Sequence, residues 1–118
     1  MKRKILVADD EKLVRDYFRY FLKKEGYEVY EAENGEFAME LIRNYEIDLV
    51  VADYKMPKKN GLELLKELRK GKNFIPVIVI SAYGTEELIK EVEKLNGIFI
   101  PKPVEFSKLK SLIEELLM

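Results

Sequence analysis

Three short apolar runs recur along the chain, at residues 5–8, 49–52 and 77–80. Each run is continuous and rich in β-branched residues, which is typical of strands that are covered on both faces of a sheet. Residues 27–30 and 97–100 form two shorter segments that also favour strands. The pattern of apolar positions therefore predicts five strands.

Each strand is followed by a longer segment with the helical period, and helices are predicted at about 12–25, 36–45, 62–70, 85–95 and 105–117. Glycines and Asn-Gly pairs separate these helices from the strands. Five alternations of strand and helix predict a parallel sheet with helices on both faces and right-handed crossovers. We therefore expect a doubly wound α/β fold, (βα)5 and flavodoxin-like, with the strands in the order 2-1-3-4-5.

The length of 118 residues favours a single domain over 1–118, with enough chain to bury a substantial core. The longest apolar runs are too short to span a membrane, and residues 1–3 lead directly into a strand instead of a signal-peptide segment. We therefore expect a cytoplasmic protein that makes no membrane contact.

Cysteine and histidine are both absent from the sequence. This excludes disulfides, thiol nucleophiles, zinc–thiolate sites and the Ser/His or Cys/His groups of hydrolases. The net charge of −1 and the even mixing of Lys with Glu argue against a nucleic-acid partner. Acid–base chemistry must therefore depend on carboxylates, lysine and hydroxyl groups.

Acidic residues follow two strands that are neighbours in the predicted order. Asp9 and Asp10 end the first strand and Asp53 ends the third, so three of the five aspartates should converge at one edge of the sheet. Two carboxylates about 5 Å apart repel by roughly 3 kcal/mol at an effective dielectric near 20, which favours a bound cation. Oxygen-only ligands point to Mg²⁺, with Mn²⁺ as a substitute. Alternatively, the first two aspartates cap the next helix and the third begins a turn.

Two further polar residues lie at the same predicted edge. Ser81 ends the fourth strand, and Lys102 ends the fifth strand between Pro101 and Pro103, which fix the backbone around it. Taken alone, the serine is more often a turn residue and the lysine a solvated one. The bond between Lys102 and Pro103 is a candidate for the cis form.

Five dispersed elements together resemble the receiver domain of two-component response regulators. They are Asp9-Asp10, Asp53, the segment DYKMPKKNG at 53–61, Ser81-Ala82 and Lys102-Pro103. The resemblance covers the whole chain, and within the family DYKMP and SAYG look most like the stand-alone regulator of the sporulation phosphorelay. It implies a phospho-accepting signalling protein that is not an enzyme in the ordinary sense. Its implied partners are a sensor histidine kinase and, in a relay, a separate histidine phosphotransfer protein, and we expect a monomer.

The resemblance also assigns roles to the residues at the predicted edge. Asp53 would attack the phosphoryl group of a phosphohistidine, giving an aspartyl phosphate. Asp10 and Asp53 would bind Mg²⁺ directly, Asp9 through water, and Lys55 through its backbone carbonyl. Lys102 would pair with the phosphoryl oxygens.

Ser81 and Phe99 are the switch residues that the resemblance implies. Ser81 would hydrogen-bond the new phosphate, and Phe99 would turn into the vacated space and reshape the face of the fourth and fifth strands. The family more often has Thr and Tyr at these two positions. These two differences from the family affect the surface that would contact a target more than they affect the phosphoryl-transfer chemistry.

Lys55 and Tyr83 flank the predicted phosphate, two positions after Asp53 and Ser81. They are either ordinary loop residues or a shield that keeps water from the aspartyl phosphate. The second interpretation predicts a long-lived phosphorylated form.

Apolar residues form two stripes on the first helix. Val14, Phe18 and Phe21 are expected to face the sheet, and a second stripe lies roughly 100° around the helix. The second stripe consists of Leu13, Tyr17 and Tyr20. It is either the edge of the core or, following the family, a docking surface where Leu13, Tyr17 and Pro103 contact a kinase helical bundle.

Two other classes of protein remain as alternatives. An aspartate-nucleophile phosphohydrolase that uses Mg²⁺ would carry a D-x-D pattern after the first strand, whereas Asp9 and Asp10 are adjacent. A pseudo-receiver would bind partners without phosphorylation, and the intact Asp53 and Lys102 argue against it.

Overall fold

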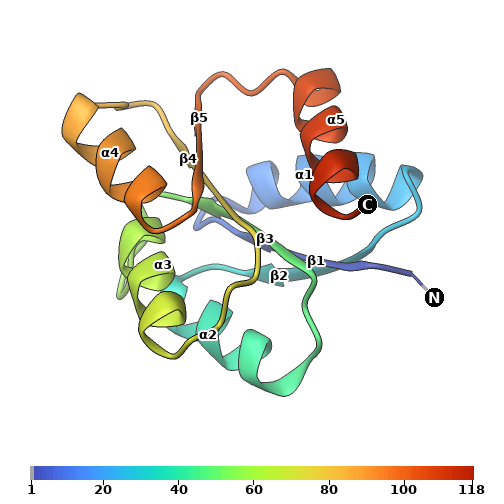
Figure 1. Cartoon of the computed structure of the whole chain (residues 1–118). Helices are drawn as coiled ribbons and strands as arrows, with labels where there is room; N and C mark the ends of the chain where they lie inside the picture. The colour runs from blue at the N-terminus through green and yellow to red at the C-terminus, as the bar shows by residue number, and fades with distance from the viewer. Residues whose placement is uncertain (1) are drawn as a thin grey trace.

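Strands and helices alternate along the whole length of the computed structural model, which describes residues 2–118 (Figure 1). Met1, part of the predicted 1–118 domain and of the segment at 1–3, lies outside the described residues. The strands are β1 Lys4–Ala8, β2 Glu28–Ala32, β3 Leu49–Asp53, β4 Val77–Ser81 and β5 Ile98–Pro101. The helices are α1 Lys12–Lys24, α2 Gly35–Asn44, α3 Gly61–Lys70, α4 Glu86–Lys94 and α5 Phe106–Leu116. Every predicted element is present. Most of the element ends differ from their predicted positions by one or two residues, and the others coincide with them.

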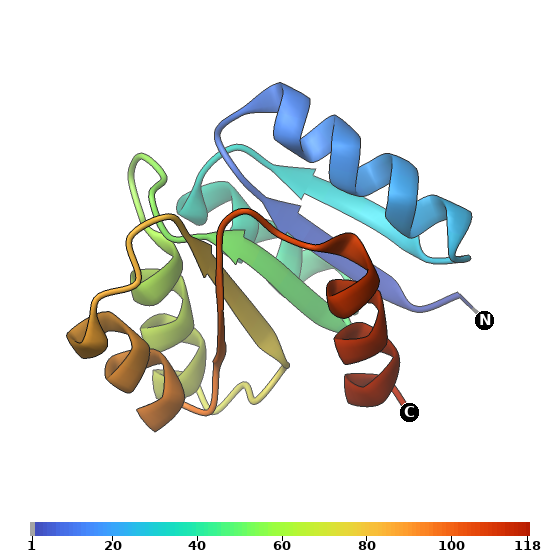
Figure 2. The same cartoon turned by 90° about the horizontal axis from the view of Figure 1, so that it is seen from above.

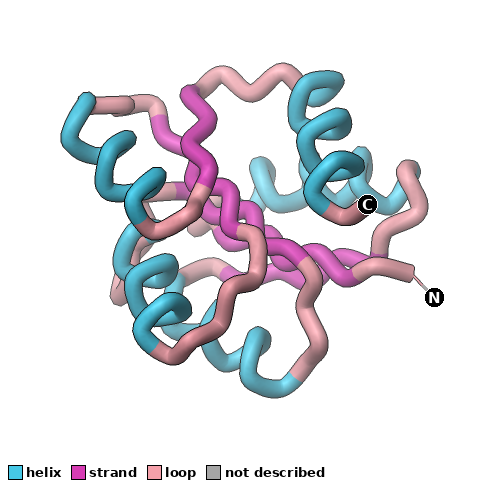
Figure 3. Tube along the Cα trace, viewed as in Figure 1, coloured by secondary structure: helices cyan, strands magenta, loops and turns pink. Residues whose placement is uncertain are grey.

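The strands form one parallel sheet in the order β2-β1-β3-β4-β5, which confirms the predicted order. Helices α1 and α5 cover one face, and α2, α3 and α4 cover the other (Figure 2). The strands thus make the middle of three layers (Figure 3). At the switch point of this order, β1 and β3 lie side by side and Ala8 is level with Ala52.

The three central strands are buried on both faces, as their continuous apolar runs predict. In β1, Ile5 and Val7 point to the α1 and α5 side, whereas Leu6 and Ala8 point to the α2, α3 and α4 side. All five residues of β3 and of β4 are buried as well. Burial on both faces makes the central strands a rigid base for the loops at their carboxyl ends.

The prediction for the inner face of α1 is partly wrong. Phe18 and Leu22 are its buried residues, with Val14 packed beside them. Phe21 is only half-buried and instead packs on the ring of Phe106, at a centroid distance of 4.6 Å. Because α5 lies beside α1 on the same face, it offers Phe21 an aromatic partner away from the sheet.

One smaller prediction is settled by the backbone. The peptide bond between Lys102 and Pro103 is cis, as the sequence suggested. Within residues 2–118, no helix has the length and apolar character needed to cross a membrane.

Candidate functional site

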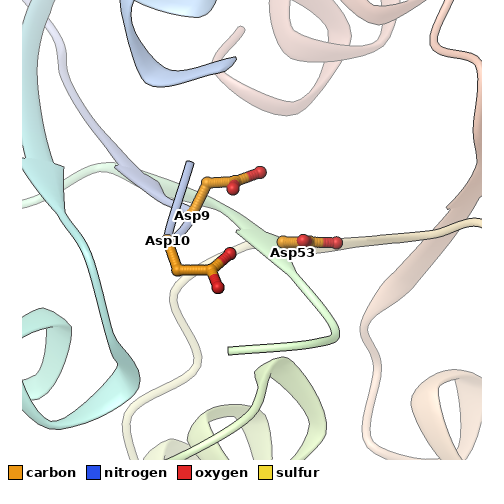
Figure 4. A group of neighbouring side chains, drawn as sticks. All are labelled: Asp9, Asp10 and Asp53. Atoms are coloured by element: carbon orange, nitrogen blue, oxygen red, sulfur yellow. The ribbon is translucent and has the colours of Figure 1, made fainter. Parts of the chain in front are cut away.

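The carboxylates of Asp9, Asp10 and Asp53 converge at the carboxyl ends of β1 and β3. One ligand oxygen from each residue lies within 4.8 Å of the others. Figure 4 shows Asp9 and Asp10, which follow β1, beside Asp53 at the end of β3. The predicted convergence is confirmed, and we refer to these residues as the acid trio.

The alternative that the first two aspartates cap a helix does not hold. The N-cap position of α1 is Glu11, whose side chain makes no capping hydrogen bond. Asp9 is 3% exposed, and its Oδ1 accepts a hydrogen bond from the backbone N–H of Glu11 at 2.9 Å. Asp53 is the last residue of β3 and is also buried, whereas Asp10 is exposed. The acid trio is therefore a feature of the sheet edge, open to solvent on the side of Asp10.

A lysine and a serine complete this edge. The Nζ of Lys102 lies 3.2 Å from Oδ1 of Asp53, so the ammonium group faces the acid trio. The backbone N–H of Lys102 donates to the carbonyl of Ser81 at 2.9 Å, which ties the end of β5 to the end of β4. The buried hydroxyl of Ser81 accepts a hydrogen bond from the backbone N–H of Tyr83 at 3.0 Å.

Burial makes the acid trio unfavourable when it is fully ionised. Burial, together with the charges of Asp53 and Asp10, raises the pKa of Asp9 to about 6, although the Glu11 N–H and Lys102 oppose the shift. Burial also raises the pKa of Asp53, and its ion pair with Lys102 partly offsets that effect. One ammonium cannot neutralise three carboxylates, so the site favours an additional cation.

The raised pKa of Asp9 predicts how stability depends on pH when divalent ions are removed. The folded chain holds the proton of Asp9 more tightly than the unfolded chain does. The stabilising contribution of this proton to the unfolding free energy is therefore fully present below pH 3.8 and is lost as the pH rises through about 6. We expect the unfolding free energy to fall by an amount on the order of 3 kcal/mol across this window. Urea unfolding in a chelator over a pH series measures it.

The control for this experiment is Asp9→Asn, which cannot titrate. Its unfolding free energy should show a smaller fall over the same window, with the remainder due to groups such as Asp53. An identical pH dependence in Asp9→Asn and the unmodified chain would contradict the assignment to Asp9.

The other predicted site residues lie around this edge. Lys55 and Tyr83 are exposed residues of the β3–α3 and β4–α4 loops. Phe99, in β5, is half-buried on the face that carries α2, α3 and α4. A Cβ atom at Gly84 would lie 2.9 Å from Cζ of Phe99, so the tip of the ring rests against the β4–α4 loop.

The second stripe of α1 is not an edge of the core. Leu13, Tyr17 and Tyr20 are 83%, 49% and 62% exposed, respectively. Leu13 and Tyr17 instead line a groove of about 660 Å³ that Pro103 also lines. The same groove reaches Asp9, Asp53 and Lys102. The three predicted contact residues are thus brought together beside the acid trio, whereas Tyr20 lies outside the groove lining.

Comparison with known proteins identifies the class that this fold and site define. The family model "Response regulator receiver domain" matches residues 5–114. The chain therefore belongs to the response regulator receiver domain family, whose members act in two-component and phosphorelay signalling.

Individual relatives agree with this class. Sporulation initiation phosphotransferase F of Bacillus subtilis is 31% identical over 118 residues, covering 99% of this chain and 95% of that protein. Response regulator RR06 of Streptococcus pneumoniae is 46% identical over 88 residues, which are 75% of this chain but only 40% of that protein. The resemblance to the sporulation-phosphorelay type is thus supported along nearly the full chain, whereas RR06 is matched over less than half its length.

Solved structures share the fold. The receiver domain of the Francisella response regulator 1452 has a TM-score of 0.93 and 32% identity, covering 98% of this chain and 97% of that chain. The chemotaxis protein CheY4 of Vibrio cholerae has a TM-score of 0.90 at 24% identity, covering 99% and 100%. The second likeness bears on the fold alone.

Proposed function

We propose that this receiver domain accepts a phosphoryl group on Asp53 from the phosphohistidine of a sensor histidine kinase, in a reaction that depends on Mg²⁺. The observation that carries the proposal is the ammonium of Lys102 at 3.2 Å from Asp53 within the acid trio. The likeness to a sporulation phosphotransferase supports a phosphorelay, in which a separate histidine phosphotransfer protein would be a second partner.

The acid trio has the donor set that Mg²⁺ prefers. Its ligand atoms are carboxylate oxygens within 4.8 Å of one another, and burial of Asp9 and Asp53 leaves their charges in need of a cation. Asp10 and Asp53 would bind the ion directly, Asp9 through water, and Lys55 through its backbone carbonyl. When bound, Mg²⁺ supplies positive charge to the phosphoryl oxygens, and Mn²⁺ could replace it.

The chain's own residues would carry out the transfer. A carboxylate oxygen of Asp53 attacks phosphorus, the P–N bond to histidine breaks, and the electron pair stays on the imidazole nitrogen, which takes up a proton. Lys102, already paired with Asp53, stabilises the charge on the phosphoryl oxygens. Ser81 then turns its hydroxyl toward the phosphate and Phe99 follows, altering the β4 and β5 face.

The groove beside the acid trio would receive the partner's histidine-bearing helix. We expect Tyr17→Ala to slow phosphoryl transfer from a phosphorylated partner by about tenfold or more, because a half-exposed aromatic side chain that lines the groove would be an anchor of the interface. Transfer of radiolabelled phosphate to the variant measures the effect.

Tyr20→Ala is the matched control for that experiment, since Tyr20 is an exposed tyrosine of the same helix outside the groove. Its transfer rate should equal that of the unmodified chain. Equal rates for Tyr17→Ala and Tyr20→Ala, with the fold and Mg²⁺ affinity intact, would remove the groove from the proposal.

Lys55 and Tyr83 would shield the aspartyl phosphate from water. Both lie on loops that follow the strands of the site, and both have solvent-exposed side chains. We expect Lys55→Ala and Tyr83→Ala to shorten the lifetime of the phosphorylated form several-fold, as followed by loss of the phosphoryl mass over time. An unchanged lifetime in both variants would mean that they are ordinary loop residues.

Labelling with acetyl phosphate, with and without Mg²⁺, tests the function as a whole. A phospho-accepting regulator gains the mass of one phosphoryl group only when Mg²⁺ is present. Continuous turnover of a generic phosphate ester would instead indicate a phosphohydrolase. No labelling under either condition would indicate a pseudo-receiver and overturn the proposal.

A further inference from the structure

Arg15 of α1 reaches back to the end of β1. Its Nη1 donates a hydrogen bond to the backbone carbonyl oxygen of Asp9 at 2.8 Å, and its side chain is only 14% exposed. That carbonyl belongs to the peptide unit that joins Asp9 to Asp10. Because a peptide unit is planar, holding its carbonyl also limits the direction in which Asp10 leaves the strand.

Arg15 is itself held by β2, the strand next to β1. Its Nε lies 3.3 Å from Oε1 of Glu31, and the other oxygen of Glu31 binds Nη1 of Arg19 at 2.9 Å. The adjacent carbonyl of Ala32 accepts the backbone N–H of Asp9 at 2.9 Å. Strand β2 thus fixes the backbone of Asp9 at its N–H directly and at its carbonyl through Glu31 and Arg15.

We infer that Arg15 is a positioning residue for the acid trio, which acts on metal affinity through the peptide unit between Asp9 and Asp10. The inference rests on the proposed function, in which that trio binds Mg²⁺. The rigid fork of a guanidinium suits this task, because it donates to Asp9 and to Glu31 at once.

The direction in which the Mg²⁺ affinity changes distinguishes a positioning role of Arg15 from a direct effect of its positive charge. A cation near the site repels Mg²⁺, so loss of the Arg15 charge alone should tighten binding. Loss of the hydrogen bond to Asp9 should weaken it, since residues that orient metal ligands typically change affinity by about 10-fold to 100-fold. A weaker affinity in Arg15→Met therefore identifies the hydrogen bond as the dominant effect.

Isothermal titration calorimetry with Mg²⁺ tests the inference on the full chain. We expect the Kd of Arg15→Met to rise by about tenfold. Arg15→Lys should restore part of the affinity, because its ammonium can donate to Asp9 but lacks the rigid planar fork with which the guanidinium holds Asp9 and Glu31 at once. Lys12→Met is the matched control: it removes the same charge from α1, and its exposed side chain pairs only with Asp16 among the contacts of residues 2–118. Its Kd should be unchanged or slightly lower.

Amide resonances give a second readout, which reports on the peptide unit between Asp9 and Asp10 independently of Mg²⁺ affinity. In ¹⁵N–¹H spectra, Arg15→Met should shift the amides of Asp10 and Glu11, whereas Lys12→Met should leave Asp10 in place. Urea unfolding verifies that each variant is folded. If Arg15→Met does not fold, Arg15→Lys is used in its place.

The outcomes distinguish this inference from the proposed function. A folded Arg15→Met, or Arg15→Lys in its place, whose Kd is equal to or lower than that of the unmodified chain overturns the inference alone, provided that the unmodified chain binds Mg²⁺. No Mg²⁺ uptake by the unmodified chain overturns both.

Discussion

Replacing Asp53 by asparagine will abolish phosphorylation of this chain by acetyl phosphate. The amide has nearly the same shape as the carboxylate but lacks the anionic oxygen that attacks phosphorus. It also breaks the ion pair with Lys102, because the asparagine has no negative charge to hold the ammonium at that position. Intact mass after labelling in Mg²⁺ should therefore show only the unmodified species.

Asp16→Asn is the matched control, since it removes one aspartate charge from α1 and leaves the acid trio unchanged. Asp16 pairs with Lys12 and Arg19 on the helix surface, so the substitution should alter labelling little. A labelled Asp53→Asn chain would show that another side chain accepts the phosphoryl group and would overturn the proposed role of Asp53.

Replacing Gly35 by alanine should destabilise the chain. A Cβ atom at this position would overlap the carbonyl oxygen of Lys59 and lie 2.5 Å from its Cβ. Neither side can move easily: the Asn34 side chain caps α2 by accepting the N–H of Phe37 at 2.8 Å, and reciprocal hydrogen bonds between Asn60 and Glu63 begin α3. We expect a loss of about 1–3 kcal/mol in unfolding free energy, larger than the gain in helix propensity.

Urea unfolding of Gly35→Ala measures this loss, and Gly71→Ala is its control. Gly71 has a φ of −82°, and an added Cβ would meet its nearest atoms at 3.6 and 3.7 Å, which is ordinary contact. Its unfolding free energy should stay within about 1 kcal/mol of the unmodified chain. Equal stability of the two variants would contradict the close approach of α2 to the β3–α3 loop.

The close approach at Gly35 also bears on the proposed metal site. The β3–α3 loop carries Lys55, whose carbonyl would complete the Mg²⁺ ligands, and Lys58 in this loop has a φ of 68°. A displaced loop would therefore weaken Mg²⁺ binding as well as the fold.

Much of the candidate site was predictable because it depends on strand ends. Parallel strands end at the same edge, so knowing that β1 and β3 are neighbours was enough to bring Asp9, Asp10 and Asp53 together. The same rule placed Lys102 and Ser81 beside them.

The contacts of α1 could not be predicted in the same way. The spacing of its apolar residues indicated which face of α1 is buried. A small rotation of the helix decides whether Phe21 or Leu22 lies in the core, and here Leu22 is buried while Phe21 packs on Phe106 of α5. The link from Arg15 to the Asp9 carbonyl was missed, because an arginine on a helix usually indicates only a solvated face.

By itself, the sequence determined the elements, their order in the sheet and the convergence of the acid trio, because local periodicity and the rule for parallel strands act without knowledge of side-chain packing. Only the tertiary structure decided which side chains hold that edge in place, how closely α2 approaches Lys59, and that a groove runs from Tyr17 to Asp53. These features depend on the distances between elements that are far apart in the sequence, and many small packing forces set such distances together.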